Sequence, residues 1–187
     1  YKSEVAEKAI DVGAMIINDI SGATMDEHML TLVGKSEVQY ILTHIQGTPK
    51  EMQKEPSYHD VVSDIRDFFV RKIDEAFKKG VQPNQLILDP GIGFGKKVSH
   101  NLEILKSLDT FLDLGRPMLI GASRKSFIGK ICGDEDPKER LSGRLAIAVW
   151  SYLQGATYLR VHDVLETKRA LKLISVIEGR AQFRSSS

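Results

Sequence analysis

The chain has 187 residues, of which 42% are hydrophobic and 27% are charged, as in an ordinary soluble domain. Its 26 lysines and arginines stand against 25 aspartates and glutamates, which argues against a nucleic-acid partner bound through bulk positive charge. No apolar run approaches the roughly 20 residues of a membrane span, and we expect neither a membrane anchor nor a secretion signal. The single cysteine, Cys132, fits a reducing compartment such as the cytoplasm. We expect a single domain over residues 1–187.

The first predicted element is a helix over residues 2–12. Val5, Ala9 and Val12 recur there with helical spacing, so they are expected to share one face. Tyr1 is not an initiator methionine, and the helical pattern begins almost at once. We therefore expect that a preceding part of the protein is missing from this chain.

After this helix, short apolar runs alternate with helical patterns. The runs predicted as strands are residues 14–17, 40–42, 86–88, 117–120 and 158–162. The patterns predicted as helices are residues 25–33, 57–79, 101–114, 136–154 and 163–179. Asp136 and Asp163 are predicted to cap the last two helices, because each is followed three residues later by a glutamate. This alternation is typical of β/α units around a parallel sheet.

A polar or ionisable residue lies at the carboxyl end of each predicted strand. These residues are Asn18, His44, Asp89, Lys125, Arg160 and His162. In a (β/α)₈ barrel all strand ends meet at one mouth, whereas a doubly wound sheet uses only the strands beside its crevice. The pattern therefore favours an α/β fold of the TIM (β/α)₈ barrel type. Because five strands cannot close a ring of eight, we expect an incomplete barrel that lacks its first three strands.

The most distinctive segment is residues 88–96, Leu-Asp-Pro-Gly-Ile-Gly-Phe-Gly-Lys, which follows a predicted strand. It matches neither the P-loop nor the dinucleotide-binding glycine pattern. Its glycines can let the backbone approach a flat ligand, and Phe94 offers a ring for stacking. Asp89 at the strand end must be paired or bind a ligand if it is buried. A glycine-rich turn without a ligand is the alternative, and we favour the binding site.

Three other segments are weaker candidates. Residues 121–127, Gly-Ala-Ser-Arg-Lys-Ser-Phe, suit an anionic or carbonyl-bearing ligand but are also typical of a solvated loop. Arg160 and His162 alternate along a strand, so both face one side and could bind phosphate; a lone histidine would be read as structural, but Arg160 two residues away favours the phosphate site. Asn18 or Asp19 is expected to face inward, where an amide suits the edge of a heterocycle.

Taken together, these segments resemble the dihydropteroate synthase family. The matching segments are residues 16–21, 43–49, 88–96, 99–102, 123–129, 140–143 and 160–164. Each segment alone is a weak signal, but the ordered set has the family's spacing and covers nearly the whole chain. One departure is Thr43, which stands where the family often has a methionine beneath the pterin.

The resemblance implies a pterin-binding (β/α)₈ transferase of folate synthesis. Such an enzyme condenses 6-hydroxymethyl-7,8-dihydropterin pyrophosphate with p-aminobenzoate, giving 7,8-dihydropteroate and pyrophosphate. It also implies Mg²⁺ as cofactor, small-molecule substrates, a homodimer through the last two helices, and a cytoplasmic location. The metal ligands are expected from the missing N-terminal part, with none in this chain, and the fragment is expected to be inactive alone.

The resemblance also assigns roles to individual residues. It implies that the pterin is bound by Asn18, Asp89, Gly121 and Lys125, with Asp89 and Lys125 catalytic. It implies that the pyrophosphate is bound by Arg160 and His162. It implies that p-aminobenzoate is bound by Phe94 and Ser126. No protein nucleophile is needed, which is consistent with an inert Cys132.

Two alternatives remain open. A related pterin-binding barrel transfers a methyl group from a folate to a corrinoid protein, and it would share Asn18 and Asp89 but need Lys125 and the Arg160–His162 pair less. The chain could instead be a non-catalytic pterin- or phosphate-binding module, or a subunit of a split barrel.

Overall fold

The computed structural model describes residues 1–48, 51–52, 54–134 and 136–181. Its strands are β1 (Ile16–Asp19), β2 (Gln39–Thr43), β3 (Leu86–Asp89), β4 (Leu119–Ile120) and β5 (Tyr158–Leu159). Its helices in the first half are α1 (Ser3–Asp11), α2 (Met29–Gly34), α3 (Val61–Lys78) and the 3₁₀ turn η1 (Pro83–Gln85). Those in the second half are α4 (Val98–Lys106), α5 (Asp109–Leu112), α6 (Ser126–Cys132), α7 (Leu141–Leu153) and α8 (Val164–Ile177).

The strands are parallel and follow one another in chain order. β1, β2 and β3 form one sheet in that order, and β4 pairs with β5. A parallel bridge between Leu88 and Met118 joins the two groups, with the Leu88 amide 2.9 Å from the Pro117 carbonyl oxygen. A doubly wound sheet would reverse its strand order, whereas a barrel keeps it. The described strands therefore form part of a (β/α) barrel, and β1 and β5 are its open edges.

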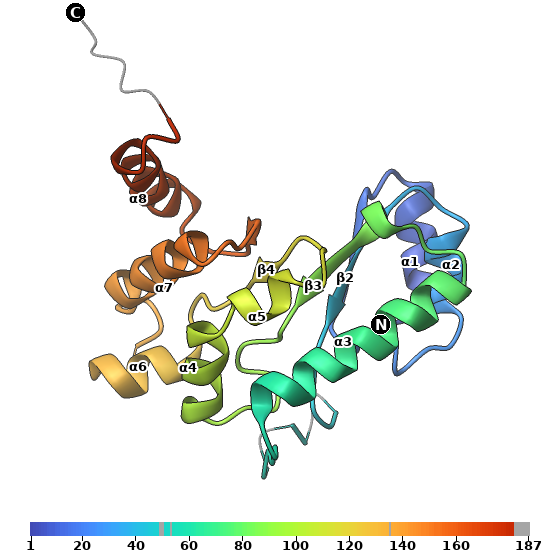
Figure 1. The fold of residues 1–187 in the computed structure, drawn as a ribbon, viewed down its shortest axis with the longest axis horizontal. Coiled ribbons are helices and arrows are strands. Elements are labelled where there is room, and N and C mark those ends of the chain that lie inside the picture. Colours follow the sequence, from blue (N-terminus) through green and yellow to red (C-terminus); the bar gives the residue numbers. More distant parts are fainter. Residues whose placement is uncertain (49–50, 53, 135, 182–187) are drawn as a thin grey trace, which may run out of the picture.

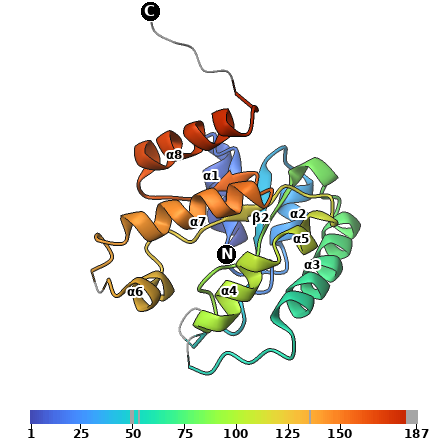
Figure 2. The same ribbon diagram turned by 60° about the vertical axis from the view of Figure 1, so that its left-hand side comes forward.

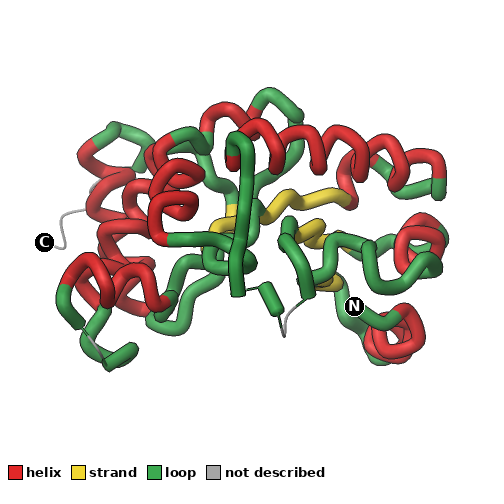
Figure 3. The backbone as a smooth tube through the Cα atoms, turned by 90° about the horizontal axis from the view of Figure 1, so that it is seen from below, coloured by secondary structure: helices red, strands yellow, loops and turns green. Residues whose placement is uncertain are grey.

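Helices surround these strands on the outside. Figures 1 and 2 show α3 running along the sheet and α7 beside α8 at one end of the molecule. In Figure 3 the strands lie in the middle and the helices form an outer layer. No helix in the described part of the chain is long and apolar enough to cross a membrane.

Successive residues along each strand face different layers. Ile17, Tyr40 and Leu42 belong to the large core between sheet and helices. Ile41, Ile87 and Leu119 form a second, small cluster with Tyr158 on the opposite, inner face of the barrel. Because β2 and β3 are covered on both faces, their sequences are continuous apolar runs rather than alternating ones. Apolar runs of this kind are what allowed the strands to be predicted.

Three helix predictions need correction. The predicted helix 2–12 corresponds to α1, Ser3–Asp11, but Val5 and the flanking Val12 are 62% and 87% exposed and Ala6 is its buried residue. The predicted helix 101–114 is divided into α4 and α5. The helix α6 was not predicted at all, since its seven residues directly follow a loop-like segment.

Of the two predicted helix caps, Asp136 is wrong and Asp163 is correct in position but makes no capping bond through its side chain. Asp136 does not begin α7, because its Oδ1 accepts from the Lys138 amide at 2.8 Å in a local turn, and the helix begins at Leu141. Asp163 does precede α8, but its side chain makes no capping hydrogen bond. Its carboxylate instead forms an ion pair with Arg144, at 3.0 Å. In both cases the carboxylate binds a partner other than the amides of the helix that follows it.

Candidate functional site

The ends of three strands are joined by one guanidinium group. Arg160, just after β5, donates through Nη1 to Asn18 Oδ1 and through Nη2 to Asp89 Oδ2, both at 3.0 Å. Asn18 is at the end of β1 and Asp89 at the end of β3. The structure thus brings together three residues that the strand-end pattern singled out, on the inner face of the barrel.

Asp89 is the most deeply placed of these groups. Its side chain is buried, and its second oxygen, Oδ1, accepts from the Gly91 amide at 2.8 Å. Burial raises the pKa of the Asp89 carboxyl, while the charge of Arg160, the Gly91 amide and the charge of Lys96 work in the opposite direction. A buried carboxylate of this kind needs donors, and here they come from a guanidinium and a backbone amide.

Gly121 makes room for that guanidinium. A Cβ atom at Gly121 would lie 2.5 Å from Arg160 Nη2, well inside van der Waals contact. Any larger residue at this position would push the guanidinium away from Asp89. Gly121, a predicted pterin-binding residue, therefore lies directly against the Arg160 guanidinium.

Lys125 is held by the glycine-rich loop. Its ammonium lies 4.1 Å from the centroid of the Phe94 ring, a cation–π arrangement. A Cβ atom at Gly93, whose φ is +78°, would lie 2.9 Å from Lys125 Cδ. Burial lowers the pKa of Lys125, an effect that Asp89 opposes and Arg160 reinforces. The loop thus brings Phe94 and Lys125 together, a contact that the sequence did not predict.

A cavity of about 680 Å³ opens beside Lys125. Its lining includes Gly93, Lys125 and Ser126 together with other basic and small polar side chains. Asn18, Asp89 and Arg160 do not line it. The predicted p-aminobenzoate contact Ser126 therefore faces a hollow that adjoins the Arg160 cluster without including it.

His162 does not share a partner with Arg160. Its Nδ1 lies 2.9 Å from the Ser123 hydroxyl oxygen, and its amide donates to the same oxygen at 3.3 Å. The alternation of Arg160 and His162 predicted one face for both. The structure gives them different contacts, one toward the barrel interior and one toward the loop after β4.

Two further residues form a buried contact that sequence reasoning did not assign. Lys96 is 4% exposed, and its Nζ lies 3.0 Å from both His44 Nδ1 and the Phe94 carbonyl oxygen. Burial lowers the pKa of Lys96 to about 7, and burial together with the Lys96 charge lowers the pKa of His44 to about 2. His44 is therefore neutral at ordinary pH and can accept from the lysine. This Lys96–His44 contact ties the glycine-rich loop to the end of β2.

The positions of Lys96 and His44 in the sequence could have indicated that both belong to the candidate site. His44 follows a strand, and Lys96 ends the glycine-rich segment. Thr43, next to His44, is fully buried on the same face as Asp89, with which it is in register, and its hydroxyl has no hydrogen-bond partner among the residues that the structure describes.

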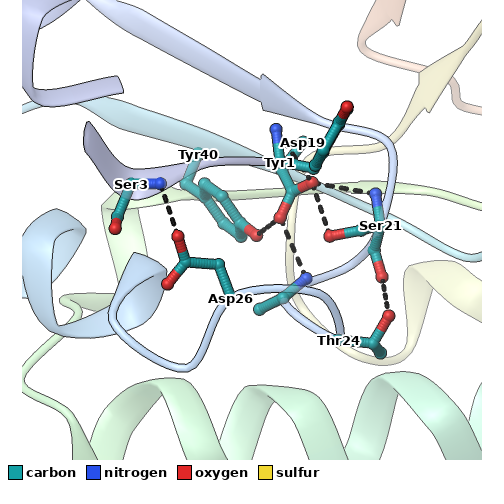
Figure 4. A network of polar contacts seen from close by, with 8 residues as sticks. Tyr1, Ser3, Asp19, Ser21, Thr24, Asp26 and Tyr40 are labelled. Atoms are coloured by element: carbon teal, nitrogen blue, oxygen red, sulfur yellow. Dashed lines mark hydrogen bonds and ion pairs between the residues drawn. The ribbon is translucent and has the colours of Figure 1, made fainter. Parts of the chain in front are cut away.

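Asp19, the neighbour of Asn18, faces the helix layer instead. Figure 4 shows its carboxylate among the Ser21 and Tyr40 side chains. Oδ1 accepts from the Ser21 amide at 2.8 Å and from its hydroxyl at 2.7 Å, and Oδ2 accepts from the Tyr40 hydroxyl at 2.6 Å and from the Ala23 amide at 3.0 Å. Burial alone would raise the pKa of Asp19, but these hydrogen bonds lower it below its usual value. Asp19 thus fixes the turn after β1, and Asn18 is the residue that faces inward.

Residues 1–162 match the sequence family described as pterin binding enzyme. The chain belongs to this family. It is 45% identical to a dihydropteroate synthase of Synechocystis over 163 residues, which cover 87% of this chain and 56% of the relative. It is 42% identical to that of Escherichia coli over 173 residues, which cover 92% of this chain and 61% of the relative. The chain therefore spans roughly three fifths of these pterin-binding enzymes.

Solved structures give the same fold. Dihydropteroate synthase from Stenotrophomonas maltophilia with active site-bound imidazole superposes with a TM-score of 0.92 at 37% identity, covering 97% of this chain and 69% of that one. The Thermus thermophilus enzyme in complex with 4-aminobenzoate superposes with a TM-score of 0.89 at 38% identity, covering 94% and 67%. This pterin-binding chain is thus similar to dihydropteroate synthases in both sequence and fold.

Proposed function

We propose that residues 1–187 are the carboxyl-terminal five-stranded part of a dihydropteroate synthase. The reaction would join 6-hydroxymethyl-7,8-dihydropterin pyrophosphate and p-aminobenzoate to give 7,8-dihydropteroate and pyrophosphate. The observation that carries the proposal is the Asn18–Arg160–Asp89 cluster at the strand ends. An amide and a buried carboxylate that face one spot suit the amino-pyrimidine edge of a pterin, which offers several N–H donors.

The neighbouring residues suit the rest of the pterin. Asp89 would accept from the ring's N–H groups, and Asn18 would bind the same edge. Lys125 would donate to the ring's other polar side, because its ammonium is partly buried and held over Phe94. Gly121 would let the ring lie close to the backbone, as it now does for the Arg160 guanidinium.

The cavity beside Lys125 suits p-aminobenzoate. Ser126 lines it, Phe94 lies against Lys125, and the basic lining would attract the benzoate carboxylate. The structure of the Thermus thermophilus relative in complex with 4-aminobenzoate supports this substrate for the family. A pterin at Asp89 and a benzoate at Ser126 would be adjacent, as a condensation requires.

The chemistry then depends on departure of the pyrophosphate. The bond between the pterin methylene carbon and the pyrophosphate oxygen breaks, and the oxygen keeps the electron pair. The amine nitrogen of p-aminobenzoate forms the new bond to that carbon and loses a proton. Arg160 and His162 would stabilise the departing anion, so catalysis would come from positioning and electrostatic stabilisation, without a protein nucleophile.

The substrate pyrophosphate offers better ligands for Mg²⁺ than the described residues do. Among the described residues, no group of three or more His, Cys, Asp or Glu side chains could hold a metal ion. The Asp89 carboxylate is already paired with Arg160. We therefore assign no step to a metal held by these residues, and propose that Mg²⁺ binds with the substrate pyrophosphate through groups outside them.

The open edges of the sheet bear on activity. β1 and β5 have no further described strand beside them, and the chain spans 56% and 61% of its two relatives. We propose that three more strands close the barrel and that the chain alone does not turn over. We also propose a cytoplasmic homodimer through α7 and α8, where Trp150, Leu153 and Leu173 are exposed. Sedimentation of the chain would test the dimer.

The decisive experiment measures pyrophosphate release that requires both substrates. The chain is assayed alone and joined to the portion of the Escherichia coli relative that it does not match. We expect release only from the joined protein, and loss of that release in Asp89→Asn but not in the exposed control Arg71→Met. Pyrophosphate release without p-aminobenzoate, or methyl transfer from a methylated folate, would contradict the proposal. A normal rate from the chain alone would contradict its inactivity.

A further inference from the structure

Arg160 hydrogen-bonds to Asn18 and Asp89, the two residues to which the proposed function assigns the edge of the pterin ring. One of its terminal nitrogens binds Asn18 and the other binds Asp89, each at 3.0 Å. These contacts join residues that are 142 and 71 positions apart in the sequence, so they form only through the fold. A pterin ring that approached Asn18 and Asp89 from the position of the guanidinium would have to displace it.

The two groups are chemically alike at this edge. A guanidinium presents N–H donors on nitrogens that share one carbon, in one plane. The amino-pyrimidine edge of a pterin presents the same arrangement of N–H donors around one carbon. Asp89 is buried and needs such a donor, and the arginine supplies one here.

Arg160 is also free to leave. Its side chain is 40% exposed, whereas that of Asp89 is 1% exposed. Gly121 beneath it adds no Cβ that would hold the guanidinium from the side. Arg160 lies close enough to Lys125 to help lower the pKa of that lysine, so two like charges lie near each other here. Displacement therefore moves a partly exposed group and leaves the buried acceptor in position.

We propose that Arg160 is a specificity-determining residue that favours pterins bearing a pyrophosphate over pterins without one. The inference rests on the proposed function. A ring that binds Asn18 and Asp89 must displace the guanidinium, which costs two charge-assisted hydrogen bonds. A pyrophosphate on the same ligand gives the displaced guanidinium a new anionic partner and offsets that cost. A pterin alcohol offers no such partner, so its binding affinity is lowered by the loss of both Arg160 hydrogen bonds.

The test compares two ligands by calorimetry: 6-hydroxymethyl-7,8-dihydropterin and its pyrophosphate ester. Both are titrated into the chain, alone and joined to the portion of the Escherichia coli relative that it does not match. We expect Arg160→Met to bind the alcohol about tenfold more tightly, the change that corresponds to one net hydrogen bond. It should bind the pyrophosphate ester more weakly, so the preference between the two ligands falls from both sides.

Arg160→Lys separates charge from competition. Lysine keeps the positive charge but, as a single point donor, cannot bridge Asn18 and Asp89 as a planar fork does. We expect it to bind the alcohol more tightly than wild type while largely keeping affinity for inorganic pyrophosphate. If circular dichroism shows that Arg160→Met does not fold, Arg160→Lys alone tests whether the arginine competes with the ring. Arg71→Met, an exposed arginine on α3, is the matched control.

The outcomes are distinguishable. If the folded variants bind the alcohol no more tightly than wild type, Arg160 only grips the pyrophosphate, and this inference is overturned while the proposed function stands. If neither ligand binds wild type in either form of the protein, the proposed function fails and this inference fails with it.

Discussion

Replacing Lys96 by methionine should remove a strong pH dependence of stability. The lysine is 4% exposed and its pKa is lowered to about 7 from a usual value of 10.5. Between these two values the unfolded chain binds more protons than the folded one, so the free energy of unfolding rises with pH. With these pKa values, the Lys96 contribution to the free energy of unfolding should rise by about 2 kcal/mol between pH 7 and pH 9.

The groups that face Lys96 support this sign. His44 is neutral above a pKa of about 2 and does not titrate in this range. The Tyr58 ring lies 5.9 Å from the ammonium, and burial raises the pKa of its hydroxyl well above the usual value, so it does not titrate in this range either. Asp89 favours the charged lysine and Lys125 disfavours it, but burial has the largest effect.

Urea unfolding at pH 7 and pH 9 measures the effect. Wild type should gain stability over this interval, and Lys96→Met should gain about 2 kcal/mol less. The exposed Lys8→Met is the matched control and should follow wild type. Equal gains for wild type and Lys96→Met would refute the reasoning, since the lysine would then be charged to the same extent in the folded and unfolded chains.

Three further predictions concern the surrounding structure. Gly93→Ala should destabilise the loop by about 1–2 kcal/mol in chemical unfolding, because φ is +78° and the new Cβ would meet Lys125 Cδ. An unchanged free energy of unfolding would show that the loop shifts at no cost. Asp19→Ala should cost about 3 kcal/mol of thermal and chemical stability, because buried donors on Ser21, Ala23 and Tyr40 lose their acceptor, with Asp19→Asn less harmful. A loss no larger than that of Asp19→Asn would contradict this account. Asp163→Ala should destabilise more than Arg144→Met, because the Arg144 side chain is 6% exposed and that of Asp163 is 24% exposed. The reverse order in chemical unfolding would show that the buried guanidinium needs no carboxylate.

The sequence predicted the central strands β2 and β3 closely, whereas β1 lies two residues later than predicted and β5 ends at Leu159, before Arg160. β2 and β3 are covered on both faces, so Tyr40, Ile41 and Leu42 form an unmistakable apolar run. The predicted side-chain caps did not form, because a carboxylate next to a helix can bind partners other than the amides of that helix. Asp136 binds a nearby amide in its own loop, and Asp163 binds Arg144 from another helix. Neither choice is visible in a spacing rule.

The candidate site was predicted at the level of residues but not of contacts. Strand ends in a barrel meet at one mouth, so Asn18, Asp89 and Arg160 could be grouped before any distance was known. That Arg160 would bridge the other two depends on the curvature of the sheet across 71 and 142 positions of sequence. The Lys96–His44 contact likewise joins two loops that are distant in sequence. It depends on the burial of Lys96, which cannot be read from the sequence.

The alternation of strand residues explains how one short segment serves both stability and binding. Asn18 and Asp19 are neighbours, yet Asn18 faces Arg160 in the barrel interior and Asp19 faces Tyr40 beneath the helices. The carboxylate holds the turn after β1 through four hydrogen bonds, so the preceding amide is presented from a fixed strand end. A change at Asp19 should therefore reach the site only by moving Asn18. Because the Arg160 bridge to Asp89 does not pass through Asp19, it should persist when the turn is loosened.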